Sequence, residues 1–339
     1  MSWHVVPARE FGAHAGRWRR LHAAGPASPL LDADFVAALL DAFGTGAELL
    51  AWHGSAGDAD VMAILAPAGR GTWNTFQPAQ APVGPWLQRD GGSPAAWLPG
   101  LLRALPGAAL MAGVTQCDPE LLARPAAMPG VRTLDYIRTA RISIDRDFDA
   151  YWNARGKNLR ANLKKQRNRL RQDGIATCLD ICRDAAGMAQ AVHDYGSLEG
   201  AGWKAARGTA VAADDAQGRF YRTLLEAFAA RGAASVYRYW IGERLAAMDL
   251  CVEGGDAIVV LKTAYDESLG QHLSPALLMR EEACRDLFDG GRFARIEFYG
   301  RVMEWHLRWT DEVRTMYHLN GYRWPWLARL HALASRNGA

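Results

Sequence analysis

Residues 257–279 read AIVVLKTAYDESLGQHLSPALLM, and they predict a strand that leads directly into a helix. Residues 257–266 are rich in β-branched and apolar side chains, as is typical of a buried strand. Ser274 followed by Pro275 indicates a helix start, because serine caps helices and proline is tolerated in the first turn. The start of such a helix presents unpaired N–H groups and a positive dipole end, so we expect an anion to bind there.

The strand carries side chains that could take part in chemistry. Alternation places Lys262, Ala264 and Asp266 on one face. Thr263 and Tyr265 lie on the other. A lysine buried alone in so apolar a strand would be costly. Lys262 is therefore expected either to contact a phosphate or carboxylate of a ligand, or to reach solvent or pair with Asp266. Tyr265 is either a proton donor or a core aromatic.

Elements of the same kind flank this stretch on both sides. The expected order is the helix 219–232, the strands 234–242, 243–255 and 256–266, the helix 274–291, the strand 292–300, the helix 301–311 and the strand 313–321. There is no internal repeat, no GxGxxG fingerprint and no phosphate-binding GxxxxGK loop.

The first half also mixes helices and strands. The expected elements are the helix 27–44, the strands 47–54, 60–69 and 71–78, the helix 93–105 and the strand 107–114. A length of 339 residues suggests about two domains. We therefore expect a mixed α/β (α+β) protein with a domain over 1–145 and a second over 146–339.

A strongly basic stretch, 155–171, contains eight Lys and Arg and no acid. We expect one helix from Phe148, capped by Asp147, to about Gly174, with Leu159, Leu163 and Leu170 on its buried face. Its cations are interpreted mainly as a solvated face, since no aromatics are interleaved for nucleic-acid stacking. Those nearest its start are expected to face an anionic ligand; they are Arg155, Lys157 and Arg160.

The composition excludes several classes of protein. Half of the residues are hydrophobic, 22% are charged and the net charge is +3, which is typical of a folded globular chain. The five cysteines form no CxxC pair, and there is no HExxH motif or nucleophile elbow. We therefore expect no metal and reduced thiols. No signal peptide or membrane span is evident, so a cytoplasmic location is expected.

Two further segments are candidates for a site. Glu297 and Tyr299 share a strand face, and a carboxylate acting through water commonly takes the proton of an attacking amine. Glu297 could equally be a solvated or cap-bonding acid. The loop GWKAARG, 202–208, places an aromatic beside two cations, which suits an anionic or sugar-bearing substrate. Its candidate residues are Trp203, Lys204 and Arg207.

Several of these stretches together resemble a known family. They are FDAYWNARGKNLRANLKKQRNRL (148–170), GWKAARGTA (202–210), FYRTLLEAFAARG (220–232), LKTAYDESLGQHLSPALLM (261–279) and FYGRVMEWHLRWTD (298–311). They are similar to the CelD/FemAB-like acyltransferases of the GCN5-related N-acetyltransferase (GNAT) superfamily. SPLLDADFVAAL (28–39) and WNTFQPAQAPVGPW (73–86) resemble that family more loosely.

The resemblance implies a tandem GNAT-like fold of two mixed-sheet halves, with the active-site cleft between them or in the second half. It implies transfer of an acyl group from acyl-CoA to an amine of a small molecule, amino sugar or peptide. The alternatives are Fem-type transfer from aminoacyl-tRNA and a non-catalytic binding module in polysaccharide biosynthesis. A tRNA is the less favoured binding partner.

If the chain carries out the reaction that the resemblance implies, the candidate residues take the following roles. Glu297, Tyr299, Tyr265 and Asp266 are the expected catalytic residues. The expected cofactor contacts are Lys262, Thr263, Gly270, Ser274 and Ala276. Substrate contacts are expected from Trp203, Lys204, Arg207, Arg155 and Arg160.

Overall fold

The structure is a computed structural model that describes residues 2–55, 57–89, 92–200, 211, 215–269 and 272–336. The chain forms two compact units. Unit 1 comprises Met1–Arg138 and Arg314–Ala339, and unit 2 comprises Thr139–Val313. Both units combine helices with a mixed sheet, so the expected α/β class is confirmed. The domain division expected at 145/146 stays a prediction.

Unit 1 is built on the strand order β1-β2-β3-β4-β6-β13, with β5 paired to β3. Only β4 and β6 pair in parallel within this series. The strands are β1 (Ser2–Pro7), β2 (Leu49–Gly54), β3 (Ala59–Gly69), β4 (Thr72–Thr75), β5 (Trp86–Gln88), β6 (Met111–Cys117) and β13 (Val313–Tyr322). The helices are α1 (Phe11–Ala23), α2 (Ala33–Phe43), α3 (Leu98–Ala104) and α10 (Pro325–Arg336).

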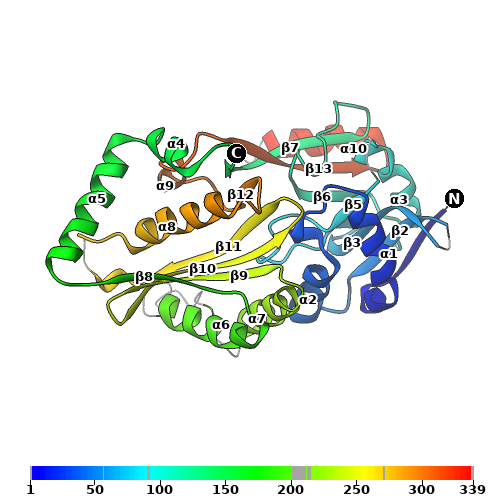
Figure 1. Cartoon of the computed structure of the whole chain (residues 1–339). Helices are drawn as coiled ribbons and strands as arrows, with labels where there is room; N and C mark the ends of the chain where they lie inside the picture. Colours follow the sequence, from blue (N-terminus) through cyan, green and yellow to red (C-terminus); the bar gives the residue numbers. More distant parts are fainter. Residues whose placement is uncertain are drawn as a thin grey trace. The chain divides into compact units, whose positions relative to one another are not determined.

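Unit 2 has the strand order β7-β12-β11-β10-β9-β8, and β7 (Val131–Ser143) enters it from unit 1. Its other strands are β8 (Thr177–Cys182), β9 (Ala234–Ile241), β10 (Arg244–Gly254), β11 (Ala257–Tyr265) and β12 (Arg295–Phe298). Its helices are α4 (Phe148–Asn153), α5 (Lys157–Gln172), α6 (Ala185–Gly200), α7 (Ala216–Ala229), α8 (Pro275–Gly290) and α9 (Glu304–Leu307). Helix α8 covers one face of this sheet, and α6 and α7 cover the other (Figure 1).

The basic stretch forms two helices where one was expected. Asp147 caps α4 as predicted, because its Oδ1 accepts a hydrogen bond from the Ala150 amide at 2.7 Å. The chain then breaks, and α5 starts after Gly156 and ends before Gly174, which has a left-handed φ of 68°. The three predicted leucines of α5 are buried, and Gln166 is buried beside them.

Helix α8 is confirmed almost residue for residue. It starts at Pro275 and ends at Gly290, and Gly291 takes the left-handed conformation that glycine adopts without strain. The helix expected over 301–311 is wrong in length, since only Glu304–Leu307 is helical. Among the described residues, no helix is long and apolar enough to span a membrane.

Candidate functional site

The strands β11 and β12 separate after a short parallel contact. Their pairing runs from Ala257 opposite Arg295 to Val260 opposite Phe298. On its other side, β11 pairs with β10 as far as Tyr265, which lies opposite Ala247. Within the described ranges, Leu261–Tyr265 therefore has a strand on one side only. Its other edge presents backbone groups that a ligand can bind.

A β-bulge in the pairing of β10 with β11 lies at the point where β11 separates from β12. Leu250 of β10 pairs with Lys262, whereas Cys251 pairs with Val260, so Leu261 is the extra residue. Because of this extra residue, the side chains that follow Leu261 lie on the opposite face of the sheet from the one that strict alternation along β11 would give. Val260 packs against the core under α8, and Lys262 lies on the opposite face, beside Tyr221 of α7.

Helix α8 follows this strand, as the sequence predicts, but Ser274 does not cap it in the expected way. Its hydroxyl makes no capping bond, and its amide donates to Oε1 of the buried Gln166 at 2.8 Å. Its carbonyl accepts hydrogen bonds from the Leu277 and Leu278 amides. Gln166 thus fixes the entry to α8 from the buried face of α5.

A buried ion pair lies under α8, between it and the strands. Nη1 of Arg280 is 2.6 Å from Oδ2 of Asp249, and both side chains are almost completely buried. Thr263, on the part of β11 that β12 no longer pairs with, donates its hydroxyl to Asp249 Oδ1 at 2.5 Å. Although burial acts to lower it, Asp249 raises the pKa of Arg280 above its usual value, so the arginine stays charged.

A neutral histidine lies just beyond the end of β12. The Phe298 ring is 5.0 Å from the Arg280 guanidinium carbon and 5.5 Å, edge to face, from the His306 ring. Burial, and then the charge of Arg280, lower the pKa of His306 to about 4. Its Nδ1 accepts the Met303 amide at 3.0 Å, so the neutral ring carries its hydrogen on Nε2. The ring is therefore a hydrogen-bond donor at neutral pH.

On the opposite face of the sheet, Lys262 has a carboxylate partner. Its Nζ is 3.8 Å from Oε1 of the buried Glu199, at the end of α6. Glu199 also accepts hydrogen bonds from Tyr195 Oη at 3.2 Å and from the Val211 amide at 2.9 Å. The expected pairing of Lys262 with Asp266 is therefore wrong: Asp266 lies 2.5 Å from Arg244 instead.

Asp266 and Tyr265, at the end of β11, have different surroundings: Asp266 is held by hydrogen bonds and an ion pair, whereas Tyr265 is exposed. Burial acts to raise the pKa of Asp266, but hydrogen bonds from Ser268 and the charge of Arg244 outweigh it and lower the pKa. Asp266 is thus a carboxylate that fixes the turn after β11. The Tyr265 side chain is exposed, so the core-aromatic alternative is wrong.

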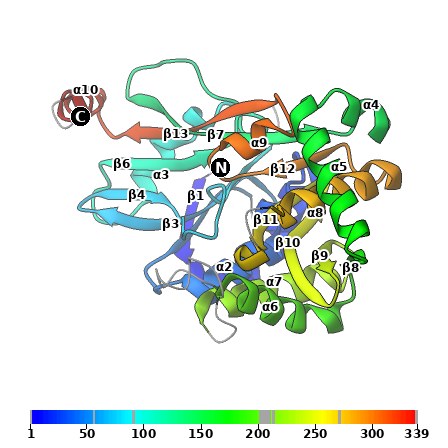
Figure 2. The same cartoon turned by 90° about the vertical axis from the view of Figure 1, so that its left-hand side faces the viewer.

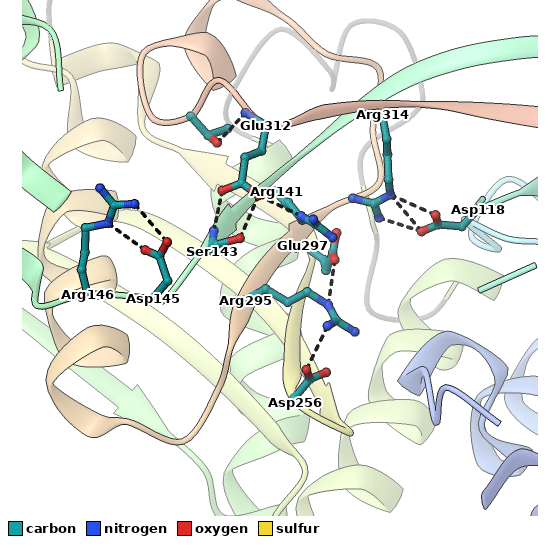
Figure 3. Close-up of polar contacts among 11 residues, drawn as sticks. Asp118, Arg141, Ser143, Asp145, Arg146, Asp256, Arg295, Glu297, Glu312 and Arg314 are labelled. Carbon is teal, nitrogen blue, oxygen red and sulfur yellow. Dashed lines mark hydrogen bonds and ion pairs between the residues drawn. The ribbon is translucent and has the colours of Figure 1, made fainter. Parts of the chain in front are cut away.

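Glu297 lies in a chain of ion pairs (Figure 3). It is buried, and its Oε1 is 3.1 Å from Nε of Arg295, which also contacts Asp256 at 2.9 Å. Arg141 stands directly opposite Glu297 in the pairing of β7 with β12. The solvated-acid alternative is therefore wrong. The expected catalytic roles of Glu297 and of the half-buried Tyr299 stay predictions.

The two candidate arginines of the basic stretch line different hollows. Arg155 donates to the Trp309 carbonyl at 2.9 Å and lines a cavity of about 720 Å³. Leu307 and Arg308, directly after His306, line the same cavity. Arg160 lines a second hollow of about 460 Å³ along α5. The other cations that line this second hollow are Lys157, Lys164, Arg167 and Arg171.

Four expected site residues lie outside the described residues: Trp203, Lys204, Arg207 and Gly270. Among the described residues, no three of His, Cys, Asp and Glu gather closely enough to hold a metal ion.

Sequence patterns missed most of the polar residues that the structure brings together. Asp249 is a single acid within the apolar run AAMDLCV, which is a usable signal, because a buried carboxylate needs a partner. Gln166 stands at a position of α5 where the leucine spacing calls for an apolar residue. Nothing in the sequence around Glu199, Arg280 or His306 separates them from surface residues.

Comparison with known proteins agrees with this architecture. The family model described as "Acetyltransferase (GNAT) domain" matches residues 157–332. No curated protein matches the chain. Solved structures that resemble it include the C-terminal domain of a putative lysylphosphatidylglycerol synthetase from Agrobacterium fabrum, at 11% identity over 96% of each chain and a TM-score of 0.57.

Two further structures are similar. FemX is 10% identical over 95% of this chain and 97% of its own, with a TM-score of 0.50. A tandem GNAT protein from the clavulanic acid biosynthesis pathway is 14% identical over 94% and 98%, with a TM-score of 0.46. At identities this low, the likenesses with TM-scores of 0.50 and 0.57 indicate a common fold and nothing about substrates. The family model, by contrast, covers more than half of the sequence, and on that ground the chain belongs to the acetyltransferase (GNAT) domain family.

Proposed function

We propose that this chain transfers an acyl group from a CoA thioester to an amine, within a CelD/FemAB-like branch of its family. The observation that carries the proposal is that β12 stops pairing with β11 at Val260, so that in the described part of the chain Leu261–Tyr265 has a strand on one side only, and that α8 is the next helix after this strand apart from one 3-10 turn. An extended ligand that contains amide groups can add to such an edge as a strand does. The pantetheine arm of CoA is a ligand of this kind.

The start of α8 suits the diphosphate of the same donor. Anions bind at helix starts because backbone N–H groups and the helix dipole point toward them. Pro275 has no N–H and the Ser274 amide is used by Gln166, so the Ala276 amide is the first that a phosphate could take. Lys262 is held by Glu199 on the opposite face, and we therefore drop it from the proposed phosphate contacts.

The thioester would lie near the end of β12, where Thr263, Phe298 and His306 meet around Arg280. The amine nitrogen attacks the carbonyl carbon, the carbonyl oxygen becomes negative, and the C–S bond then breaks as the carbonyl re-forms. We assign the Nε2–H of His306 to stabilise that oxygen. Exposed Tyr265 is proposed to protonate the departing thiolate, and water carries away the ammonium proton.

Acetyl-CoA and longer acyl-CoAs are expected to stabilise the protein against heat. At a ligand concentration of about 100 times Kd, binding to the folded state adds about 2.7 kcal/mol to its stability. A thermal-shift titration measures this, with pantetheine and adenosine 3′,5′-bisphosphate as controls that supply the two ends of the donor separately. Flat curves for every acyl-CoA would remove the CoA donor from consideration.

His306→Asn is expected to lower kcat about 100-fold or more while leaving KM for the donor nearly unchanged. Loss of one donor to a developing oxyanion costs about 10²–10³ in rate. Asparagine keeps an oxygen near the position of Nδ1 to accept the Met303 amide, so the fold of 303–306 is retained. Steady-state kinetics of CoA release measure both constants. A variant with unchanged kcat would exclude this role.

Aminoacyl-tRNA is a second candidate donor, and the cationic hollow along α5 favours it. Arg167 is not free for RNA, because it is 2.5 Å from Glu282 and 2.8 Å from Glu281. Neutralising Lys157, Lys164 and Arg171 together is therefore the sharper test. Salt-sensitive tRNA binding that this triple variant loses would favour the second donor.

A further inference from the structure

The last helix of unit 1 turns its most apolar face outward. Trp326, Leu330 and Leu333 of α10 are 53%, 54% and 58% exposed. Their spacing of four and three residues places them in one stripe along the helix. A helix that served only to cover the core would bury such a stripe.

The opposite face of α10 holds the helix on unit 1. Ala328 is buried, and His331 Nδ1 lies 2.6 Å from Oη of Tyr322, the last residue of β13. The outward stripe is therefore not the face by which α10 packs on the core, because a different face of the helix already contacts unit 1. Figure 2 shows α10 beyond the end of β13, at the outer edge of unit 1.

Neighbouring side chains enlarge the stripe into a patch. Trp324 is 45% exposed, and its ring stacks on Trp326 at 5.9 Å with 8° between the planes. Met128 is 46% exposed in a turn whose Gly130 accepts a hydrogen bond from the Tyr322 amide. We call Met128, Trp324, Trp326, Leu330 and Leu333 the α10 patch. These five are half of the ten large apolar side chains exposed in the described part of the chain, so the exposure is concentrated rather than scattered.

The segment that carries most of the α10 patch is basic. Residues 323–336 contain three arginines and no Asp or Glu, whereas Arg124, near Met128 in sequence, is paired with Asp135 at 2.6 Å. Arg329 is exposed within α10, next to the stripe. Arg323 lies with its guanidinium carbon 5.8 Å from the Trp324 ring.

We propose that the α10 patch binds the surface of an anionic lipid bilayer. Helices that lie in the plane of a membrane interface combine tryptophan and leucine on one face with flanking arginine or lysine. The indole ring suits the headgroup level, because it is apolar with one polar N–H. This proposal rests on unit 1 alone and does not depend on the proposed function.

A second copy of the chain fits the same patch less well. In a symmetric pair each patch meets itself, so Arg329 would lie beside cations of the other copy. Residues 323–336, which carry all of the patch except Met128, contain no acid to balance them. Anionic lipid headgroups supply negative charge opposite these arginines. The apolar stripe can then lie at the boundary between the headgroups and the acyl chains.

Vesicle co-sedimentation tests the proposal with the full chain. We expect binding to phosphatidylcholine vesicles that contain phosphatidylglycerol and much weaker binding to phosphatidylcholine alone. The triple variant Trp326→Ser, Leu330→Ser, Leu333→Ser should lose binding about a thousandfold or more, which is a loss to background in this assay, because three apolar side chains no longer enter the bilayer. Arg329→Gln should lose about fivefold, as one arginine near an anionic surface contributes about 1 kcal/mol.

The controls separate this surface from a general stickiness or a self-interface. Ile175→Ser removes an exposed apolar side chain of unit 2 and should bind vesicles as the unchanged protein does. The melting curve of the triple variant should match the unchanged protein, because its changed side chains are exposed. Equal vesicle binding by the triple variant, or no binding by the unchanged protein, overturns the proposal. So does a dimer in sedimentation equilibrium that the triple variant abolishes.

Discussion

Arg280→Met is expected to cost about 3–5 kcal/mol of unfolding free energy, because it leaves the carboxylate of Asp249 buried without its cation. The Asp249 side chain is 1% exposed, and Thr263 is the hydrogen-bond donor that would remain to it. Methionine is a good helix former of similar length, so α8 itself should not be weakened. Urea unfolding followed by tryptophan fluorescence measures the change.

A matched variant on the same helix isolates the effect of burial. Arg285→Met breaks an ion pair with Asp149 in which the two side chains are 49% and 75% exposed, and exposed pairs contribute about 1 kcal/mol or less. The double variant Asp249→Leu, Arg280→Met removes both charges and should regain most of the loss. Equal costs for Arg280→Met and Arg285→Met would show that the buried pair is not what stabilises unit 2.

Local patterns predicted the elements that have a strong period or clear ends. The strand at 257–265 and α8 follow from an apolar run and a Ser-Pro start, and both are found where expected. Helix α9 was overestimated: Trp305 and Trp309 stand four residues apart, as on one face of a helix, yet only Glu304–Leu307 is helical. Helix α10 was not among the predicted elements, although Trp326, Leu330 and Leu333 have a helical spacing and Pro325 is a typical first helical residue.

The candidate site was harder to predict because its geometry depends on two long-range features. The bulge at Leu261 decides that Lys262 lies on the face of α6 and meets Glu199, and alternation within one strand does not reveal the partner. The end of β12 at Phe298 decides where β11 loses its neighbour. The pairing of Arg280 with Asp249 joins positions 31 residues apart, on different elements. Such contacts follow from tertiary packing rather than from local sequence.

His306 is expected to make the protein less stable in acid. Its pKa is about 4 in the folded protein, against 6.5 for an unperturbed histidine, because burial and Arg280 disfavour the imidazolium. Below pH 6.5 the unfolded chain therefore binds a proton that the folded chain does not. Stability from this residue is fully present above that pH, falls as the pH decreases and levels off near pH 4. The loss is at most about 3 kcal/mol, at about 1.36 kcal/mol per pKa unit.

The variant His306→Asn isolates this contribution from the carboxylates that titrate in the same range. Its stability difference from the unchanged protein, measured by urea unfolding at steps from pH 7.5 to pH 4, should shift by up to about 3 kcal/mol in favour of the variant. His193→Asn changes an imidazole that is 62% exposed and serves as the control. If the curves for His306→Asn and the unchanged protein run parallel, the ring is not held neutral by burial. Its assignment as a neutral donor at the end of β12 would then fail as well, because both rest on the same uncharged imidazole.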